Sequence, residues 1–184
     1  MRGGLFGGIG GPAMRIYLPA TLSRLRSALE SRSIPVLSGV AFAVTEPLRL
    51  EYPDWAEDDL EYLAMQDASR ASLRLLAAAG AAEPMLRVVI ATDVPDDSVT
   101  PRPEADRAVV SVPGPIDWSQ AAAVHIDGAD AGSAVAEAAA VIDAADLGDH
   151  DAEFALGSAE DFDLAWYAPG EVTYLFDELD GEPG

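Results

Sequence analysis

DWAEDDLEYLAMQDASRASLRLLAAAG, residues 54 to 80, is the stretch of the sequence that decides the fold. At 100° per residue, its apolar and small side chains fall on one side of a helix and its polar side chains on the other. The apolar side consists of Leu60, Ala64, Met65, Ala68, Ala71, Ser72, Leu75, Leu76 and Ala79. We therefore predict an amphipathic helix that lays this side against a sheet and leaves the polar side in water.

Both ends of this stretch carry the residue types that helix ends favour. Asp54 stands where an N-cap side chain accepts a first-turn N–H group, and Glu57 follows three residues later. Gly80 stands where a left-handed C-cap is favoured. The predicted helix therefore begins near Asp54 and ends at Gly80.

Shorter patterns on both sides of this helix predict the other elements. Apolar alternation and β-branched residues indicate strands at 15–18, 40–44, 87–94, 107–112, 121–127 and 162–168. Helical spacing indicates helices at 21–31 and 130–147 and a short closing helix from Pro169. Residues 46–53 and the acidic segment 149–161 show no clear period, and we expect loops there, with 149–161 the most mobile of them.

The order of these elements predicts an α+β fold. We expect one mixed sheet of five or six strands packed against three main helices, with a short C-terminal helix; an α/β fold of three layers is the alternative. Short turns separate the strands at 87–94, 107–112 and 121–127, which we therefore expect to be antiparallel neighbours, the first two as a hairpin.

The chain is expected to form one domain. Residues 14–179 read as a single globular unit, preceded by a flexible extension at 1–13 that packs on nothing and followed by a disordered tail at 180–184. No apolar run approaches the roughly 20 residues of a membrane-spanning helix. Glycines interrupt the apolar residues at the start, which argues against a secretory signal. Together with the absence of Cys, this leads us to expect a cytoplasmic protein.

Charge excludes one class of partner. The chain has a formal net charge of −21, all eleven of its basic residues are Arg, and none lies after Arg107. Such a field repels nucleic acid and anionic membranes, so we expect direct binding to neither. A protein partner or a homodimer is compatible with this charge.

The sequence contains no recognisable catalytic or cofactor motif. His125 and His150 are the only histidines, and no Cys is present to complete a zinc site. We expect His125, which alternates with Val124 and Ile126, to be solvent-facing or hydrogen-bonded in a structural role. The acidic clusters lack the ligand spacing of a calcium loop, and no G-x-S-x-G motif is present. We therefore expect no catalytic residue, metal or cofactor.

Polar and aromatic residues in unusual places are the candidates for a binding surface. They are Tyr62, Gln66, Asp67, Arg70, Trp118 and Tyr167. The first four lie within two turns on the polar side of the main helix, and Tyr167 follows Trp166 in the last predicted strand, so one of these two faces the core. Exposed aromatics beside polar groups are typical of interfaces.

Six segments together resemble a family of uncharacterised actinobacterial proteins known as a domain of unknown function. They are MRIYLPATLSRL from Met14, AFAVT at 41–45, DDLEYLAMQDASRASLRLL at 58–76, TDVPD at 92–96, Trp118 followed by AVHID at 123–127, and LAWYA at 164–168. The resemblance extends over about residues 14–175 and implies a cytoplasmic bacterial protein. The glycine-rich start and the acidic region 143–161 depart from it. It brings no catalytic or binding residue with it.

Three interpretations of function remain open from sequence. The first is a non-catalytic, acidic protein-interaction module. The second is a small-molecule-binding protein or enzyme that uses carboxylates near Tyr62 and Asp67 in a cleft. The third is an acidic decoy that occupies a basic nucleic-acid-binding protein. A concave pocket with converging polar groups favours the second, and a flat apolar patch of several hundred Å² favours the first. A pull-down whose yield collapses with salt favours the third.

Overall fold

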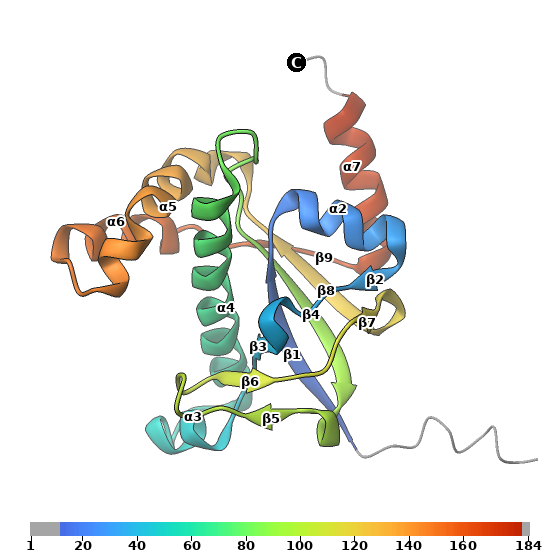
Figure 1. Cartoon of the computed structure of the whole chain (residues 1–184), viewed down its shortest axis with the longest axis vertical. Helices are drawn as coiled ribbons and strands as arrows, with labels where there is room; N and C mark the ends of the chain where they lie inside the picture. The colour runs from blue at the N-terminus through green and yellow to red at the C-terminus, as the bar shows by residue number, and fades with distance from the viewer. Residues whose placement is uncertain (1–11, 182–184) are drawn as a thin grey trace, which may run out of the picture.

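The computed structural model describes residues 12–181, and within them nine strands form two sheets (Figure 1). The strands are β1 (Ala13–Ala20), β2 (Ser33–Ile34), β3 (Val40–Phe42), β4 (Val88–Pro95), β5 (Thr100–Pro101), β6 (Val109–Ser111), β7 (Ile116–Asp117), β8 (Ala121–Ile126) and β9 (Ala165–Tyr167). Seven of them form the central sheet, in the order β5-β6-β3-β1-β4-β8-β9, and β2 pairs with β7. The α+β class predicted from sequence is confirmed.

Six helices accompany these strands in the described part of the chain. They are α2 (Leu22–Ser31), α3 (Glu46–Glu51), α4 (Glu57–Ala79), α5 (Gly132–Asp146), α6 (His150–Glu160) and α7 (Val172–Gly181). Figure 1 shows α2 and α7 on one side of the central sheet and α4 on the other, with α5 and α6 packed outside α4. The long helix predicted from residues 54–80 is thus the main cover of one face.

Every strand pair among residues 12–181 is antiparallel, although we expected a mixed sheet. The reason is the position of β1, which lies between β3 and β4 and runs antiparallel to both. The crossover through α4 therefore joins two strands that run in the same direction but are not neighbours.

The predicted hairpin between 87–94 and 107–112 is wrong. β4 pairs with β1 and β8, so both of its edges are occupied, while β6 pairs with β3 and β5 on the far side of β1. The strands 107–112 and 121–127 do not pair either. Of the three strands expected to be antiparallel neighbours, only 87–94 and 121–127 pair, as β4 with β8, and these two are not consecutive in the sequence.

Alternation along β1 and β4 sends side chains to two separate cores. On one face Ile16, Leu18 and Ile90 pack with residues of α2 and α7. On the other face Tyr17 and Val89 pack with residues of α4 and α3. A third cluster lies between α4, α5 and α6, away from the sheet.

The packing of α4 confirms most of its predicted apolar side. Leu60, Ala64, Ala68, Ser72 and Leu76 are buried as expected, whereas Ala79 is exposed. Leu73 and Ser69 are also buried, and Leu73 joins the cluster between α4, α5 and α6. The helix has a second neighbour, so its buried surface is wider than one stripe. Its N-cap is Ala56, which offers no side-chain hydrogen bond, and not Asp54.

Two segments expected to be loops are helices. In the segment 149–161, Asp149 caps α6 by accepting the N–H of Ala152, and Ala152, Leu156 and Ala159 form a buried stripe against α5. In 46–53, Thr45 caps α3, and Leu48 is completely buried. A six-residue helix with one buried side chain, such as α3, and a helix whose buried residues are mostly alanines, such as α6, both give a weak periodic signal, which is why we missed them.

A buried ion pair fixes the position of the α5 and α6 pair on the sheet. The Arg87 guanidinium donates from Nε and Nη2 to the carboxylate of Asp127, each at 2.8 Å, and the two side chains are 2% and 0% exposed. Nη2 also donates to the carbonyls of Ala159 and Phe162 at 2.9 Å. The start of β4, the end of β8 and the end of α6 are therefore joined by one residue.

The ordered fold extends slightly beyond residues 14–179. Ala13 is the first residue of β1, and the Pro12 carbonyl accepts a hydrogen bond from the Asp96 N–H at 2.9 Å, so these two residues do not belong to an unpacked extension. At the other end, Asp180 lies in α7 and pairs with Arg26 at 2.9 Å. Our predictions for residues 1–11 and 182–184 lie outside the described residues.

Candidate functional site

The polar side of α4 faces two separate hollows. Tyr62 lines the first, where Gln66 supports it by a hydrogen bond, and Asp67 and Arg70 line the second. The four side chains therefore do not form the single site that the sequence predicted, because the curvature of the helix surface separates them. Each hollow collects its remaining residues from other parts of the chain.

The first hollow, which we call the aromatic groove, has a volume of about 270 Å³. Its lining residues are Arg15, Tyr17, Asp58, Glu61, Tyr62, Met65, Ala123, His125 and Trp166. Asp58, Glu61, Tyr62 and Met65 share one side of α4 because their spacing is i, i+3, i+4 and i+7. The other residues come from β1, β8 and β9.

The groove exists because α4 does not extend over the whole sheet. The helix packs mainly on β1, β3 and β4. Ala123 of β8 is still buried in the cluster that contains Ala64 and Ala68 of α4, whereas β9 lies farther out, at the edge of the sheet. His125 of β8 and Trp166 of β9 are cross-strand partners and both line the groove. Trp166 keeps 60% of its surface exposed, and Tyr62 keeps 45%. The described helices leave this strip of the sheet uncovered.

Hydrogen bonds hold the tyrosines of the groove in place. The Tyr62 hydroxyl accepts from Gln66 Nε2 at 3.0 Å and donates to Asp163 Oδ1 at 3.3 Å. The Tyr17 hydroxyl donates to Glu61 Oε2 at 3.4 Å. Burial, together with the charge of Glu61, raises the pKa of Tyr17, so this phenol stays protonated and remains a donor.

The charges of the groove are unevenly neutralised. Arg15 forms a two-point ion pair with Asp93 at 2.7 and 3.1 Å. Asp58, Glu61 and Asp163 form no ion pair with any arginine among residues 12–181. Burial and the charge of Arg15 lower the pKa of His125, which favours the neutral imidazole. The groove therefore presents aromatic rings next to carboxylates that have no cationic partner.

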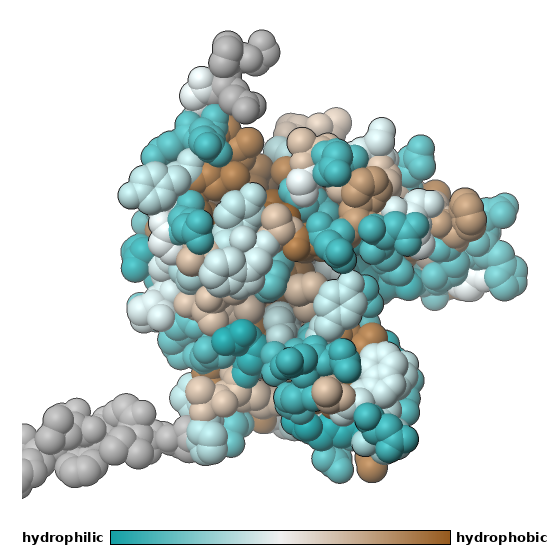
Figure 2. Space-filling view, turned by 180° about the vertical axis from the view of Figure 1, so that it is seen from behind, coloured by the Kyte–Doolittle hydropathy of each residue, from teal (hydrophilic) through white to brown (hydrophobic). Residues whose placement is uncertain are grey.

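The second hollow, which we call the arginine cleft, has a volume of about 600 Å³. It is lined by Phe42, Glu51, Asp67, Arg70, Arg74, Asp106, Arg107, Ala145, Asp146, Gly148 and Glu153. Figure 2 shows the molecule from behind, with a notch between the arm formed by α5 and α6 and the part below it that contains α3. The cleft lies between these parts, beside α4.

Each arginine of the cleft is paired with a carboxylate. Arg70 bonds Asp146 and Glu153, each at 3.0 Å, and Arg74 bonds Asp146 at 2.7 Å. Arg107 bonds Glu51 at 3.0 Å, lies 3.6 Å from Asp67 and donates to the Tyr52 hydroxyl at 2.9 Å. The cleft is polar, and its charges largely satisfy one another.

Asp67 and Asp146 experience opposite environments within this cleft. Burial raises the pKa of Asp67, and the charge of Arg107 only partly opposes that effect. Hydrogen bonds from Arg74 and Arg70 lower the pKa of Asp146. A carboxylate that the fold disfavours in its charged form is a candidate for a functional group, since such shifts gather at functional sites.

Trp118 and Tyr167 do not belong to either hollow. Trp118 is 4% exposed and lies in the core between the sheet and α2, so its place in the candidate surface is wrong. Tyr167 is partly buried against the same core, on the opposite face from Trp166. The alternation of the last strand therefore exposes Trp166 instead.

Tyr62 is the one candidate from the sequence among the nine lining residues of the groove, and His125 and Trp166 are among the eight that we did not select. A signal for both was present, because alternation with Val124 and Ile126 turned His125 away from one core, and Trp166 alternates with Tyr167. What the sequence lacked was the pairing of β8 with β9, which places these two side chains side by side.

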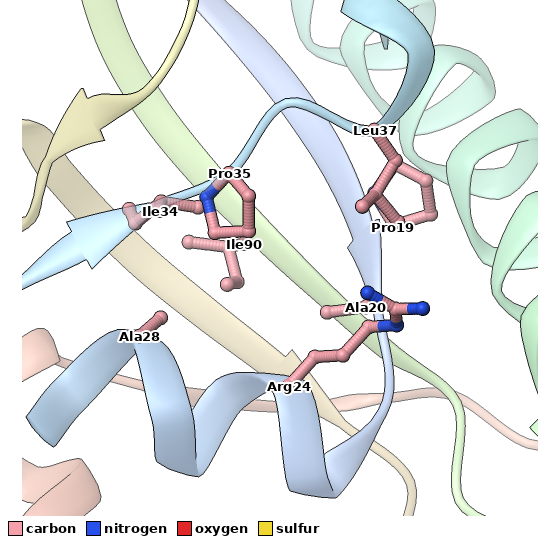
Figure 3. A pocket seen from close by; sticks show the side chains of 8 residues that line it. All are labelled: Pro19, Ala20, Arg24, Ala28, Ile34, Pro35, Leu37 and Ile90. Atoms are coloured by element: carbon pink, nitrogen blue, oxygen red, sulfur yellow. The ribbon is translucent and has the colours of Figure 1, made fainter. Parts of the chain in front are cut away.

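Three further hollows lie in the described part of the chain. One of about 540 Å³ adjoins the aromatic groove, with which it shares Arg15 and Glu61, and its charged residues Arg15 and Asp93 pair with each other, as do Arg49 and Glu57. One of about 420 Å³ lies along α2 and is lined mainly by small residues and serines. A cavity between α2 and the sheet, lined by Arg24 and seven smaller or apolar residues, has a volume of about 10 Å³ and is large enough for about one water molecule (Figure 3). Within residues 12–181, no three His, Cys, Asp or Glu side chains are arranged to hold a metal ion.

Residues 14–176 match a protein family described as "Family of unknown function (DUF6912)". The chain belongs to this family. The DUF6912 match includes the lining residues of the groove and the cleft and the acidic segment 143–161. Comparison with curated proteins and with solved structures finds no match. In the described part of this DUF6912 protein, no helix has the length and apolar character needed to cross a bilayer.

Proposed function

We propose that the protein is a non-catalytic interaction module that binds a protein partner through the aromatic groove. The observation that carries this proposal is the exposure of Trp166 of β9 and Tyr62 of α4, at 60% and 45%, in one hollow between the helix and the sheet. Large aromatics in water cost free energy that burial against a partner would recover, and aromatic residues dominate the energetics of interfaces. A second copy of the chain is one form that this partner can take.

The chemistry of the groove supports binding over covalent catalysis. Its lining contains no Ser, Thr or Cys that could act as a nucleophile, and its one histidine has a lowered pKa. The proposal includes a cytoplasmic location and an actinobacterial origin, which a chain with Arg but no Lys or Cys supports. We also propose that the protein does not bind nucleic acid directly, because its net charge of −21 repels phosphates.

Affinity purification from the native host tests this function. Wild-type protein should retain a partner that the Trp166→Ala and Tyr62→Ala variants lose, while all three keep the same melting temperature. Tyr174→Ala is the matched control, because Tyr174 is 71% exposed on α7, outside the groove. Equal retention by the groove variants and by the control would contradict the proposal. Light scattering of the purified protein distinguishes a second copy from a different partner.

The arginine cleft supports a second candidate, the binding of a small polar ligand. Its volume of about 600 Å³ is that of a small-molecule site, and Asp67 is held there with a raised pKa. A ligand carboxylate could replace Asp146 or Glu153 on Arg70. A panel of small carboxylic acids should then raise the melting temperature of the wild type and leave that of Arg70→Ala unchanged. No rise with any acid of the panel would count against this candidate.

A further inference from the structure

A contact of an arginine, an aromatic ring and a carboxylate occurs twice in the described part of this protein, and the aromatic groove contains the last two of these three components. It has aromatic rings at Tyr62 and Trp166, and it has carboxylates at Asp58 and Glu61, one helical turn apart on α4. It lacks a free cation, because Arg15 is already bound at two points by Asp93. A partner can therefore supply the arginine that would complete the contact.

Elsewhere the same protein shows what completes this contact. The Arg26 guanidinium lies 4.3 Å from the centre of the Phe176 ring and bonds Asp180 at 2.9 and 3.0 Å. The Arg107 guanidinium lies 5.5 Å from the centre of the Tyr52 ring and bonds Glu51 at 3.0 Å. In both places an arginine lies over a ring and pairs with a neighbouring carboxylate.

We propose that the aromatic groove takes an arginine side chain from a basic segment of a partner protein, with its guanidinium over the Tyr62 and Trp166 rings and facing Asp58 and Glu61. This inference rests on the proposed function and adds the chemistry of the partner. The planar guanidinium stacks on aromatic rings and bonds carboxylates at two points, which an ammonium group does not match. A negatively charged segment is excluded by the three unpaired carboxylates around the rings.

Charge complementarity at long range agrees with the local chemistry. The whole chain has a net charge of −21 and attracts any basic segment. The same attraction would act on every acidic part of the surface, so it cannot select the groove. The groove is selected by the rings, and the experiment must separate these two contributions.

Peptide binding to the full chain tests the inference. The probe is a fluorescein-labelled peptide of alternating Gly and Arg, about ten residues long, with citrulline and lysine versions as comparisons. We expect the arginine peptide to bind at least about tenfold more tightly than the neutral citrulline peptide, and more tightly than the lysine peptide. In the NMR spectrum, the indole N–H signal of Trp166 should shift, while the signals of Trp55 and Trp118 should not.

Two pairs of charge-matched variants separate the groove from general attraction. Asp58→Asn with Glu61→Gln removes two charges from the groove, and Asp177→Asn with Glu178→Gln removes two exposed charges from α7. The groove pair should weaken binding of the arginine peptide about tenfold or more, as should Trp166→Ala. The α7 pair should change it by less than about twofold, since exposed charges at a distance are screened.

Several results would overturn the inference. Equal weakening by the two pairs of variants would mean that the peptide responds only to net charge. Equal binding of the citrulline and arginine peptides would mean that no cation is recognised. If either occurs while Trp166→Ala still loses the host partner, the proposed function stands and only the arginine chemistry fails. If Trp166→Ala keeps the host partner, the proposed function fails as well.

Discussion

Helices cover the two faces of the central sheet to different extents, and the exposure of one tryptophan on each face shows the difference. The face under α2 and α7 encloses Trp118, which is 4% exposed. The face under α4 ends in the aromatic groove, where Trp166 is 60% exposed. The first face is closed by apolar contacts, while the second is only partly covered, because α4 packs mainly on β1, β3 and β4 and leaves Trp166 on the edge strand β9 exposed.

This comparison teaches where to look for function in a protein without a catalytic motif. Side chains on the closed face stabilise the fold by leaving water, at about 25 cal/mol per Å² of apolar surface. Trp166 gains little from folding, and stability alone does not explain a tryptophan at its position. The open face is therefore where binding should be tested, and mutations can measure how different the two faces are.

The largest expected effect comes from the tryptophans themselves. Trp118→Ala should lower the free energy of unfolding by about 4 kcal/mol, because it removes a large buried side chain and leaves a cavity. Trp166→Ala should change it by less than about 1 kcal/mol, because its side chain is mostly in water. Urea denaturation of the two variants measures both values. Similar losses from the two variants would contradict the comparison between the faces.

The buried ion pair gives the next largest effect. Asp127→Asn should cost about 3 kcal/mol, since it leaves the Arg87 guanidinium, which is 2% exposed, without a counter-charge. Replacement of both partners, as Arg87→Met with Asp127→Leu, should restore part of this loss, because no unpaired charge then remains. Urea denaturation measures each variant, and Arg102→Met, at an exposed pair with Glu104, is the control. A cost near zero for Asp127→Asn would contradict this prediction, because it would mean that the buried Arg87 guanidinium does not need the charge of Asp127.

Much of the fold follows from local signals in the sequence. The helix of residues 57–79, the strands β1, β4 and β8 and the α+β class were predicted because their apolar periods are long and regular. The helix α3 was missed because it has six residues and buries only Leu48, and α6 was missed because two of its three buried residues are alanines. The position of β1 between β3 and β4 was missed because strand order depends on contacts between distant segments.

The candidate site was predictable only in part, for a similar reason. Tyr62 was selected because its residue type was unusual on the polar side of a helix, and it does line the groove. Trp118 was selected on its position after a turn, which does not determine whether a ring points in or out. The groove also needs the alignment of His125 with Trp166, which is a property of strand pairing and not of either segment.

Histidine titration tests how far the open face excludes water. The pKa of His125 is lowered from 6.5 by burial and by Arg15, so the unfolded chain binds this proton more readily than the folded one. The stability that comes from the neutral imidazole is present above about pH 6.5 and is lost as the pH falls toward the folded pKa. The free energy of unfolding of the wild type should therefore decrease as the pH falls from about 6.5 toward the folded pKa, by less than the effects above. The free energy of unfolding of His125→Asn should decrease less over the same range. His150→Asn, at the exposed start of α6, is the control, and urea titrations at each pH provide the measurement. Parallel pH profiles for wild type and His125→Asn would mean that the groove is as wet as the bulk surface.

The smallest effect, and the one most diagnostic of function, concerns the two aspartates of the arginine cleft. Burial raises the pKa of Asp67, so its charged form costs stability above that pKa, and Asp67→Asn should slightly stabilise the protein at pH 7. The advantage of the variant should disappear as the pH falls toward 3.8, where the wild-type carboxyl is also neutral.

Asp146 is the matched control with the opposite sign, because Arg74 and Arg70 lower its pKa. Asp146→Asn should therefore lose stability at pH 7, and the loss should shrink in acid. Because the pKa of Asp146 is lowered from 3.8, its loss shrinks only below that pH, so thermal melts of both variants from about pH 7 to about pH 2 measure the two signs. A residue that is kept although its removal stabilises the fold is retained for a reason other than folding, and a destabilised Asp67→Asn variant would instead place Asp67 among the structural ion pairs.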